Sequence, residues 1–330
     1  MNDLRGKTIL VTGAGGFIGS RLAYTLAAEN AKVKVLLRSG LRKETYQRNG
    51  IEVVRGDITL PESLPQAVED CQIIFHCAVG GDELEVARQI NVQGTLNLMK
   101  VAALAGTNRV VHVSSVAVHG TTLPKIVRED QLYLKDGSVY AITKAEGEQA
   151  AIHFGEEKNL EVVIIRPTLV YGPNSLDWTI SLLDKIKYEQ ILLVGGGVGI
   201  VNLVYIDDLV QGMILAAISP GVSGEAFFIS GNEIVSWREF IGKYALLLGK
   251  PMPPSLPLWQ AKIGYQIGVW RYRLTRKPNK ITPLSLYTHV QQSVYSIEKA
   301  QQRLGYTPQF TLDQGLVKIE EWLIENNYLP

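Results

Sequence analysis

The stretch Thr8-Ile9-Leu10-Val11-Thr12-Gly13-Ala14-Gly15-Gly16-Phe17-Ile18-Gly19 sets the fold of this 330-residue chain. It opens with a short apolar run that is typical of a buried strand, and apolar residues then repeat at helical spacing as far as Leu26. Gly13 permits a tight turn, Gly16 lets the backbone approach a pyrophosphate, and Gly19 lets helix and strand pack closely. The N-terminus of such a helix faces the anion, so the stretch predicts a dinucleotide site rather than an ordinary glycine turn.

A second pattern lies in Ser138-Val139-Tyr140-Ala141-Ile142-Thr143-Lys144. The stretch is helix-forming, so Tyr140 and Lys144 project from one helical face. Free tyrosine has a pKa of about 10, so a tyrosine that carries a proton near neutrality needs its anion stabilised by about 4 kcal/mol. Lys144 can supply that stabilisation only in a desolvated cleft, helped by a second positive charge such as an oxidised nicotinamide ring. The pair therefore predicts a dinucleotide nearby.

Together with Ser114-Ser115, these motifs resemble the extended short-chain dehydrogenase/reductase family, also called the NAD-dependent epimerase/dehydratase superfamily. The resemblance covers nearly the whole chain. It implies that Ser115 hydrogen-bonds the reacting oxygen, that Tyr140 gives or takes the hydroxyl proton, and that Lys144 binds the nicotinamide ribose. Ser115 also ends a predicted parallel strand, Val110-Val111-His112-Val113, and ligands bind outside the carboxyl ends of such strands. A serine that merely ends a strand is the alternative.

Alternating strand and helix signals predict an α/β fold: a Rossmann doubly wound parallel sheet with a smaller, mostly helical C-terminal substrate lobe. We expect residues 1–173 plus 200–232 to form the NAD(P)-binding domain, and residues 174–199 plus 233–330 to form the lobe. The net charge of +1 gives no global field that would attract nucleic acid. No apolar run approaches the ~20 residues of a membrane span, and we find no export signal, so we expect a soluble, cytoplasmic enzyme. A homodimer is one possible assembly.

The two cysteines and the histidines predict neither a disulfide nor a metal site. Cys71 and Cys77 are separated by six residues of extended chain, roughly 20 Å, so we expect reduced, buried thiols. The five histidines show no ligand spacing, and no metal is predicted. His76 opens a loop that resembles the family's cofactor loop, and His119 follows the serine strand. Both could line the cleft, although a hydrogen-bonded loop residue is the favoured interpretation of each.

The end of the second predicted strand indicates the choice of cofactor. NAD enzymes usually place a carboxylate there to hold both ribose hydroxyls, whereas this chain has Leu37 followed by Arg38, with Arg42 and Lys43 close behind. Arg38 can bind a 2′-phosphate as a fork, which favours NADP(H) and leaves NAD(H) possible. An exposed loop arginine is the alternative. Asp57 resembles the adenine-edge residue of the family.

The stretch 166–173 resembles the family loop that packs on nicotinamide. The full set of predicted cofactor contacts is Gly13, Gly15, Gly16, Phe17, Ile18, Gly19, Arg38, Asp57, Ile58, Cys77, Ala78, Tyr140, Lys144, Pro167 and Val170. The predicted substrate contacts are Ser115, Val79, His119 and Tyr171.

The C-terminal third bears on the substrate. Ser296 is predicted to cap a helix that ends at Gly305, and this ending resembles the 3β-hydroxysteroid dehydrogenase-like branch and related keto-acid and dihydroflavonol reductases, although sugar-nucleotide enzymes share it. Val201 stands where nucleotide-sugar epimerases usually have an arginine that binds the substrate diphosphate. The basic run 271–280 contains no acid. It could hold an anionic substrate or touch a membrane surface, and a solvated face is the favoured interpretation.

The resemblance and these residues lead to one expectation with two alternatives. We expect an NAD(P)-dependent oxidoreductase that interconverts a ketone and a secondary alcohol on a small, hydrophobic substrate. The first alternative is a nucleotide-sugar epimerase or dehydratase, in which the hydride returns to the substrate. The second is a cofactor-sensing protein without turnover, which the complete Ser115, Tyr140 and Lys144 set argues against.

Overall fold

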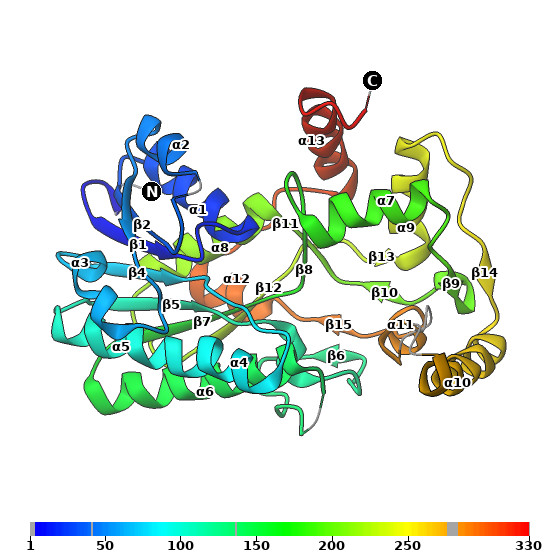
Figure 1. Ribbon diagram of the computed structural model, residues 1–330, viewed down its shortest axis with the longest axis horizontal. Coiled ribbons are helices and arrows are strands. Elements are labelled where there is room, and N and C mark those ends of the chain that lie inside the picture. The colour runs from blue at the N-terminus through cyan, green and yellow to red at the C-terminus, as the bar shows by residue number, and fades with distance from the viewer. Residues whose placement is uncertain (1–3, 41, 136, 276–282, 330) are drawn as a thin grey trace.

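The computed structural model describes residues 4–40, 42–135, 137–275 and 283–329 (Figure 1). Its centre is a seven-stranded sheet in the order β12-β7-β5-β4-β1-β2-β3, and every neighbouring pair is parallel. The strands of this sheet are β1 (Thr8–Thr12), β2 (Lys32–Leu37), β3 (Glu52–Arg55), β4 (Ile73–His76), β5 (Arg109–Val113), β7 (Glu161–Pro167) and β12 (Ala226–Ile229). The order confirms the predicted doubly wound Rossmann architecture.

Helices cover both faces of this sheet. One face carries α1 and α8, and the other carries α4, α5 and α6 (Figure 1). The helices of this domain are α1 (Phe17–Ala28), α2 (Lys43–Arg48), α3 (Pro65–Val68), α4 (Leu84–Arg88), α5 (Gly94–Leu104), α6 (Val139–Lys158), α8 (Ile206–Ile218) and α12 (Glu298–Leu304).

Successive strand residues alternate between two apolar cores, as the pleat of a strand requires. In β1, Ile9 and Val11 join the core beneath α1 and α8, while Leu10 joins the core beneath α5 and α6. In β5, Val111 joins the core beneath α1 and α8, and Val110 joins the core beneath α5 and α6. Both faces of the strands are therefore buried, which explains the continuous apolar runs in the sequence.

The sheet reverses its winding direction at β1, which pairs with β2 on one side and with β4 on the other. Gly13 follows β1 with a φ of +69°, and a Cβ atom there would lie 2.5 Å from the carbonyl carbon of Cys77, which follows β4. Only glycine lets these two loops approach so closely. The switch point thus brings the glycine loop and the Cys77 loop together, where open α/β sheets bind ligands.

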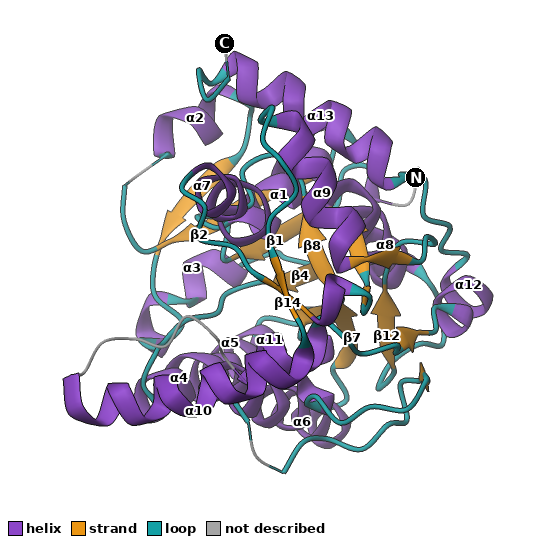
Figure 2. Ribbon diagram, turned by 90° about the vertical axis from the view of Figure 1, so that its right-hand side faces the viewer, coloured by secondary structure: helices purple, strands orange, loops and turns teal. Residues whose placement is uncertain are grey.

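A smaller lobe lies beside the carboxyl edge of the sheet (Figures 1 and 2). Its helices are α7 (Ser181–Lys187), α9 (Trp237–Leu247), α10 (Leu258–Thr275), α11 (Pro283–Thr288) and α13 (Leu312–Glu325). The remaining strands are short: β6 (Ile126–Val127), β8 (Leu169–Tyr171), β9 (Leu193–Val194), β10 (Ile200–Val201), β11 (Leu203–Tyr205), β13 (Val235–Ser236), β14 (Ser255–Leu256) and β15 (Val294–Tyr295). They form four two-stranded sheets, in which β8 pairs with β11, β9 with β14, β10 with β13 and β6 with β15.

The C-terminal segment returns to the large domain within the range that was predicted as lobe. Helix α12 contacts β12 and α8, and it ends at Gly305 in the left-handed conformation, as predicted. Its N-cap is Ile297 rather than Ser296, although the Ser296 hydroxyl still accepts a hydrogen bond from the Glu298 amide at 3.3 Å. The division into two lobes at the stated residues stays a prediction.

A buried ion pair connects β7 to α6. The guanidinium of Arg166 donates to the Glu148 carboxylate at 2.5 Å, and the two side chains are 4 % and 0 % exposed. Arg166 also donates to the Glu129 carbonyl at 2.8 Å and to the Tyr133 hydroxyl at 3.1 Å, while the Tyr133 hydroxyl donates to Glu148 at 2.7 Å. Removing two charges from water is costly. Here the attraction between the charges and the hydrogen bonds to Glu129 and Tyr133 offset that cost.

We predict that Glu148→Gln lowers the free energy of unfolding by about 3 to 5 kcal/mol, because it leaves the Arg166 charge buried without its counter-ion. Urea denaturation measures the change. Arg21→Ala is the matched control, since it breaks the Arg21–Asp207 pair, whose side chains are 51 % and 27 % exposed, and should cost less than about 1 kcal/mol. Equal losses of unfolding free energy in the two variants would show that burial does not make the Arg166–Glu148 pair more important for stability than an exposed pair.

Candidate active site

Ser115 lies directly after β5, at the carboxyl edge of the sheet. It caps a short 3-10 helix, Val116–His119, and its hydroxyl oxygen accepts a hydrogen bond from the Ala117 amide at 3.1 Å. That bond uses the oxygen as an acceptor and leaves the hydroxyl hydrogen available as a donor. The local turn therefore aims a hydrogen-bond donor into the region above the sheet.

Tyr140 occupies the first turn of α6, a helix that Ser138 caps by accepting from the Ala141 amide at 3.2 Å. The residue as a whole is 44 % exposed, although neighbouring atoms enclose its phenolic end. Burial of the phenol among its neighbours raises the pKa of Tyr140 above its ordinary value, while a side-chain hydrogen bond with Ser115 lowers it by a smaller amount and the Asp177 charge raises it. Tyr140 therefore holds its proton near neutrality, and its phenol lies within hydrogen-bond reach of the Ser115 hydroxyl.

Lys144 lies one turn further along α6 and is buried. Its ammonium group donates to the backbone carbonyl of Val113, the last residue of β5. Burial lowers the pKa of Lys144 to about 8, partly opposed by the Cys77 and Glu148 side chains. The lysine thus connects α6 to the strand that precedes Ser115, and it stays mostly charged at neutral pH but loses its charge above about pH 8.

The glycine loop fits a dinucleotide. Gly15 and Gly16 are exposed at the N-terminus of the 12-residue helix α1, whose first amide groups have no partner within the helix. A Cβ atom at Gly19 would lie 2.5 Å from the Gly13 carbonyl oxygen, so glycine is required for the turn to close against the helix. Phe17 and Ile18, also predicted contacts, are half-buried at the start of α1.

Three further segments at the same edge hold predicted cofactor contacts. After β3, the Asp57 carboxylate accepts from the amide and hydroxyl of Thr59, both at 2.9 Å, and the Ile58 side chain is buried. Pro167 is the last residue of β7 and Val170 lies on β8, and both are buried. After β4, Cys77 and Ala78 are half-buried, so Cys77 is less buried than the sequence suggested; both cysteines are free thiols.

The end of β2 is basic. Leu37 is buried, whereas Arg38, Arg42 and Lys43 are exposed. Arg38 forms no ion pair with any residue in the part of the chain that the structure describes. The nearest acid along the chain, Glu44, lies 3.9 Å from Arg48 on α2. A guanidinium free to meet an anionic ligand therefore stands next to the glycine loop.

His119 and His76 have no free ring nitrogen. Arg166 donates to His119 Nε2 at 3.1 Å, so Nδ1 must carry the proton that goes to the Leu132 carbonyl at 3.1 Å. His76 lies between the hydroxyls of Thr12 and Thr95, at 2.8 and 2.9 Å, and burial lowers its pKa to about 3. Both imidazoles are structural in this arrangement, which agrees with the interpretation favoured from sequence.

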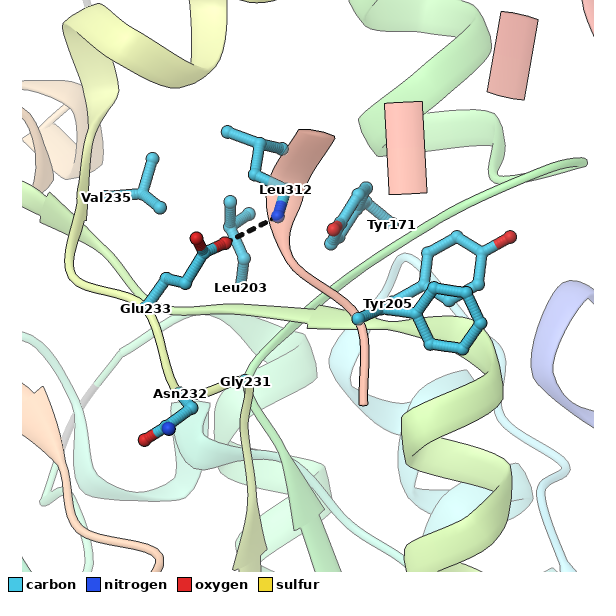
Figure 3. A pocket seen from close by; sticks show the side chains of 9 residues that line it. Tyr171, Leu203, Tyr205, Gly231, Asn232, Glu233, Val235 and Leu312 are labelled. Carbon is cyan, nitrogen blue, oxygen red and sulfur yellow. Dashed lines mark hydrogen bonds between the residues drawn. The ribbon is translucent and has the colours of Figure 1, made fainter. Parts of the chain in front are cut away.

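Two other predicted substrate residues differ in accessibility. Val79 is 49 % exposed in the loop after β4. Tyr171 is buried on β8, and its hydroxyl donates to the Thr311 carbonyl at 3.3 Å. Tyr171 also lines a cavity of about 10 Å³ with Tyr205, Glu233 and others, in which the Glu233 carboxylate accepts from the Leu312 amide at 2.5 Å (Figure 3). That cavity has room for about one water molecule, so it is not a substrate site.

Asn91 is a site residue that the sequence analysis missed. It lies in a π-helical turn, Gln89–Gln93, between α4 and α5. Its amide donates to the Gly80 carbonyl at 3.1 Å and to the Thr143 hydroxyl at 2.9 Å, and its oxygen accepts from the Gly80 amide at 3.0 Å. Asn91 therefore fixes the loop after β4 against the helix of Tyr140 and Lys144. π-turns recur at functional sites, but nothing in apolar spacing reveals them.

The chain is similar to several known proteins. The model of the NAD dependent epimerase/dehydratase family matches residues 9–230. The 2-alkyl-3-oxoalkanoate reductase of Stenotrophomonas maltophilia is 30 % identical over 94 % of this chain and 98 % of that protein. The 3-beta-hydroxysteroid dehydrogenase of Mycolicibacterium neoaurum is 28 % identical over 94 % and 89 %. The solved structure of MoeE5 in complex with UDP-glucose and NAD is 26 % identical, with a TM-score of 0.77 over 97 % of this chain and 99 % of that one.

We predict that NADPH binding weakens as the pH rises through about 8, because the Lys144 ammonium loses its proton there. Below that pH the charged form predominates and affinity should be constant. Nicotinamide fluorescence titrations across this range measure the dissociation constant. Lys144→Met should bind weakly with no such step, whereas Lys158→Met, at the far end of α6, should keep the wild-type profile. A wild-type profile without a step near pH 8 would remove this role from Lys144.

Proposed function

The chain belongs to the NAD dependent epimerase/dehydratase family, and from that premise we propose that it interconverts a ketone and a secondary alcohol on a small hydrophobic substrate. The observation that carries the proposal is the meeting of Ser115, Tyr140 and Lys144 at the carboxyl edge of the sheet, beside the glycine loop. This set handles the oxygen and the proton of a carbonyl reduction, and the hydride would come from a bound dinucleotide.

The small lobe supports a hydrophobic substrate over a sugar nucleotide. Val201 is 2 % exposed and pairs with Val235 in the β10–β13 ladder. It cannot bind a diphosphate, because it offers no donor and does not reach the surface. The names of the reductase and steroid dehydrogenase relatives agree with a ketone or alcohol substrate of this kind.

In the reductive direction, Tyr140 donates its phenolic proton to the substrate oxygen as that oxygen becomes a hydroxyl. The Ser115 hydroxyl donates a hydrogen bond to the same oxygen and holds it near the phenol. Lys144 would hold the ribose of a bound dinucleotide, and its ammonium offers positive charge to the phenolate that forms. NADPH, when bound, supplies the hydride to the carbonyl carbon. The raised pKa of Tyr140 keeps the phenol protonated before the reaction begins, but it also makes the phenol a weaker acid, so proton donation relies on positive charge that stabilises the phenolate.

We predict that purified protein consumes NADPH when given a 2-alkyl-3-oxoalkanoate or a 3-keto steroid. Tyr140→Phe should lose at least about 100-fold in turnover with unchanged NADPH affinity, because it removes only the proton donor. Ser115→Ala should lose less. The matched control is Tyr188→Phe, at a side chain that is 64 % exposed. Near-native turnover by Tyr140→Phe would refute the mechanism.

A nucleotide-sugar epimerase or dehydratase is the second candidate, favoured by the likeness to MoeE5, whose structure holds UDP-glucose. Calorimetric titration separates the two candidates. Tight, saturable binding of UDP-glucose, with no NADPH consumption on hydrophobic ketones, would establish the second. A cofactor-sensing role without turnover would require that no compound of either class be converted.

For the cofactor, we propose a preference for NADP(H) over NAD(H). The support is the exposed cluster of Arg38, Arg42 and Lys43 at the end of β2, where the buried Leu37 replaces the usual carboxylate. Arg38 can form two hydrogen bonds with a 2′-phosphate. Arg42 and Lys43 add further positive charge, so the cluster does not repel the phosphate.

We predict that NADPH binds roughly five- to a hundredfold more tightly than NADH, from a contact of about 1 to 3 kcal/mol, and that salt reduces the difference. Arg38→Ala should erase most of it without improving NADH binding, because alanine cannot bind ribose hydroxyls. Arg48→Ala, at the end of α2, is the control and should keep the preference. Dissociation constants that favour NADH in the unmutated protein would overturn the assignment and leave the catalytic residues untouched.

A further inference from the structure

Helix α10 (Leu258–Thr275) lies at the outer edge of the small lobe (Figures 1 and 2). One of its faces packs against the protein, where Leu258, Ala261 and Tyr265 join an apolar cluster with Val194 and Leu286. The three helix residues recur at three- and four-residue spacing, so they define the inward face of α10.

The opposite face of α10 carries exposed apolar side chains. They also recur at three- and four-residue spacing and fall within a sector roughly 80° wide that points away from the inward face. These residues, which we call the α10 stripe, are Trp259, Ile263, Ile267, Trp270 and Leu274, and they are 63 %, 52 %, 63 %, 68 % and 74 % exposed. Single exposed apolar residues are ordinary, but a contiguous set of this kind indicates an interaction surface.

Positive charge borders the α10 stripe on both sides. Arg271 lies along one edge, and Lys262 and Arg273 lie along the other; all three are exposed. The sequence has no Asp or Glu from residue 240 to residue 297, a segment that contains eight lysines and arginines. Because the whole chain has a net charge of only +1, the rest of it is net negative. Positive charge is therefore concentrated in this stretch of the sequence, of which residues 276–282 lie outside the described part of the chain.

An apolar stripe with tryptophans and cationic borders matches the physics of a membrane interface. Tryptophan favours the boundary between headgroups and acyl chains, and long cationic side chains reach the phosphates while their stems stay in apolar surroundings. No helix among the described residues is long and apolar enough to cross a bilayer. A helix with this distribution lies in the plane of the surface instead.

We propose that α10 anchors the protein to an anionic lipid surface, with the α10 stripe inserted among the acyl chains and Lys262, Arg271 and Arg273 at the headgroup phosphates. A second copy of this chain is a poorer occupant, because a self-complementary contact through the stripe would bring the same cationic borders together. The proposal goes beyond the chemistry of the active site and does not depend on it.

The test is co-sedimentation of the full chain with vesicles of phosphatidylcholine and phosphatidylglycerol in equal parts, compared with vesicles of phosphatidylcholine alone. We expect binding to be at least about tenfold stronger to the anionic vesicles and to weaken as salt is added. Equal binding to both kinds of vesicle, or to neither, would contradict the anchor.

Two double variants separate the apolar and electrostatic contributions. Ile267→Gln with Trp270→Gln should lower partitioning roughly tenfold or more, and Arg271→Gln with Arg273→Gln should lower it roughly 30-fold at low salt. NADPH affinity should be unchanged in both, which shows that the fold is intact. Leu104→Gln is the matched control, since Leu104 is 89 % exposed at the end of α5 and should not affect vesicle binding.

Sedimentation velocity without lipid tests whether a second copy of this chain, rather than a lipid surface, covers the α10 stripe. The anchor predicts that Ile267→Gln with Trp270→Gln leaves the oligomeric state as it is in the unmutated protein. If the same variant converts a dimer to a monomer, the α10 stripe is a contact between copies of this chain and the proposal fails. Full vesicle binding by both double variants would also overturn it, because the surface would then lie elsewhere.

Discussion

The site depends on the buried Arg166–Glu148 ion pair. It joins β7, which lies within the sheet, to α6, which carries Tyr140 and Lys144. A buried charge pair tolerates little displacement, because separating the charges in a medium of low dielectric is costly. The pair therefore fixes where α6 lies on the sheet, and with it the position of the phenol relative to β5 and the Ser115 turn that follows that strand.

Two further contacts fix how closely α6 approaches the π-turn and how it is rotated about its axis. A Cβ atom at Gly147 would lie 2.4 Å from the Asn91 carbonyl oxygen, so α6 approaches the π-turn as closely as backbones allow. On the adjacent turn, Lys144 donates to the Val113 carbonyl. Residues from α6, the π-turn and β5 are distant in sequence, and packing rather than local propensity holds them at one place.

Local patterns were enough to predict the confirmed parts of the fold. The strand, glycine turn and helix that begin at residue 8 each follow from spacing within one turn or one strand, and the parallel, doubly wound sheet follows from the alternation of strand and helix signals. The Asn91 turn and the partners of His119 could not be predicted, because both depend on where distant segments meet. The sequence also did not reveal that the apolar stripe of α10 is exposed. Apolar residues at helical spacing usually form a core face, and only the structure shows which side of the helix is covered.

Burial acts in opposite senses on the two titrating groups of the site. It raises the pKa of Tyr140, which keeps its proton, and lowers the pKa of Lys144 to about 8, which weakens its charge. A neutral phenol is the form that can protonate a ketone oxygen, whereas oxidation of an alcohol needs the phenolate. Without a cofactor, the site therefore holds a neutral phenol near neutral pH. The phenolate would need added positive charge, and an oxidised nicotinamide ring carries that charge whereas a reduced ring does not.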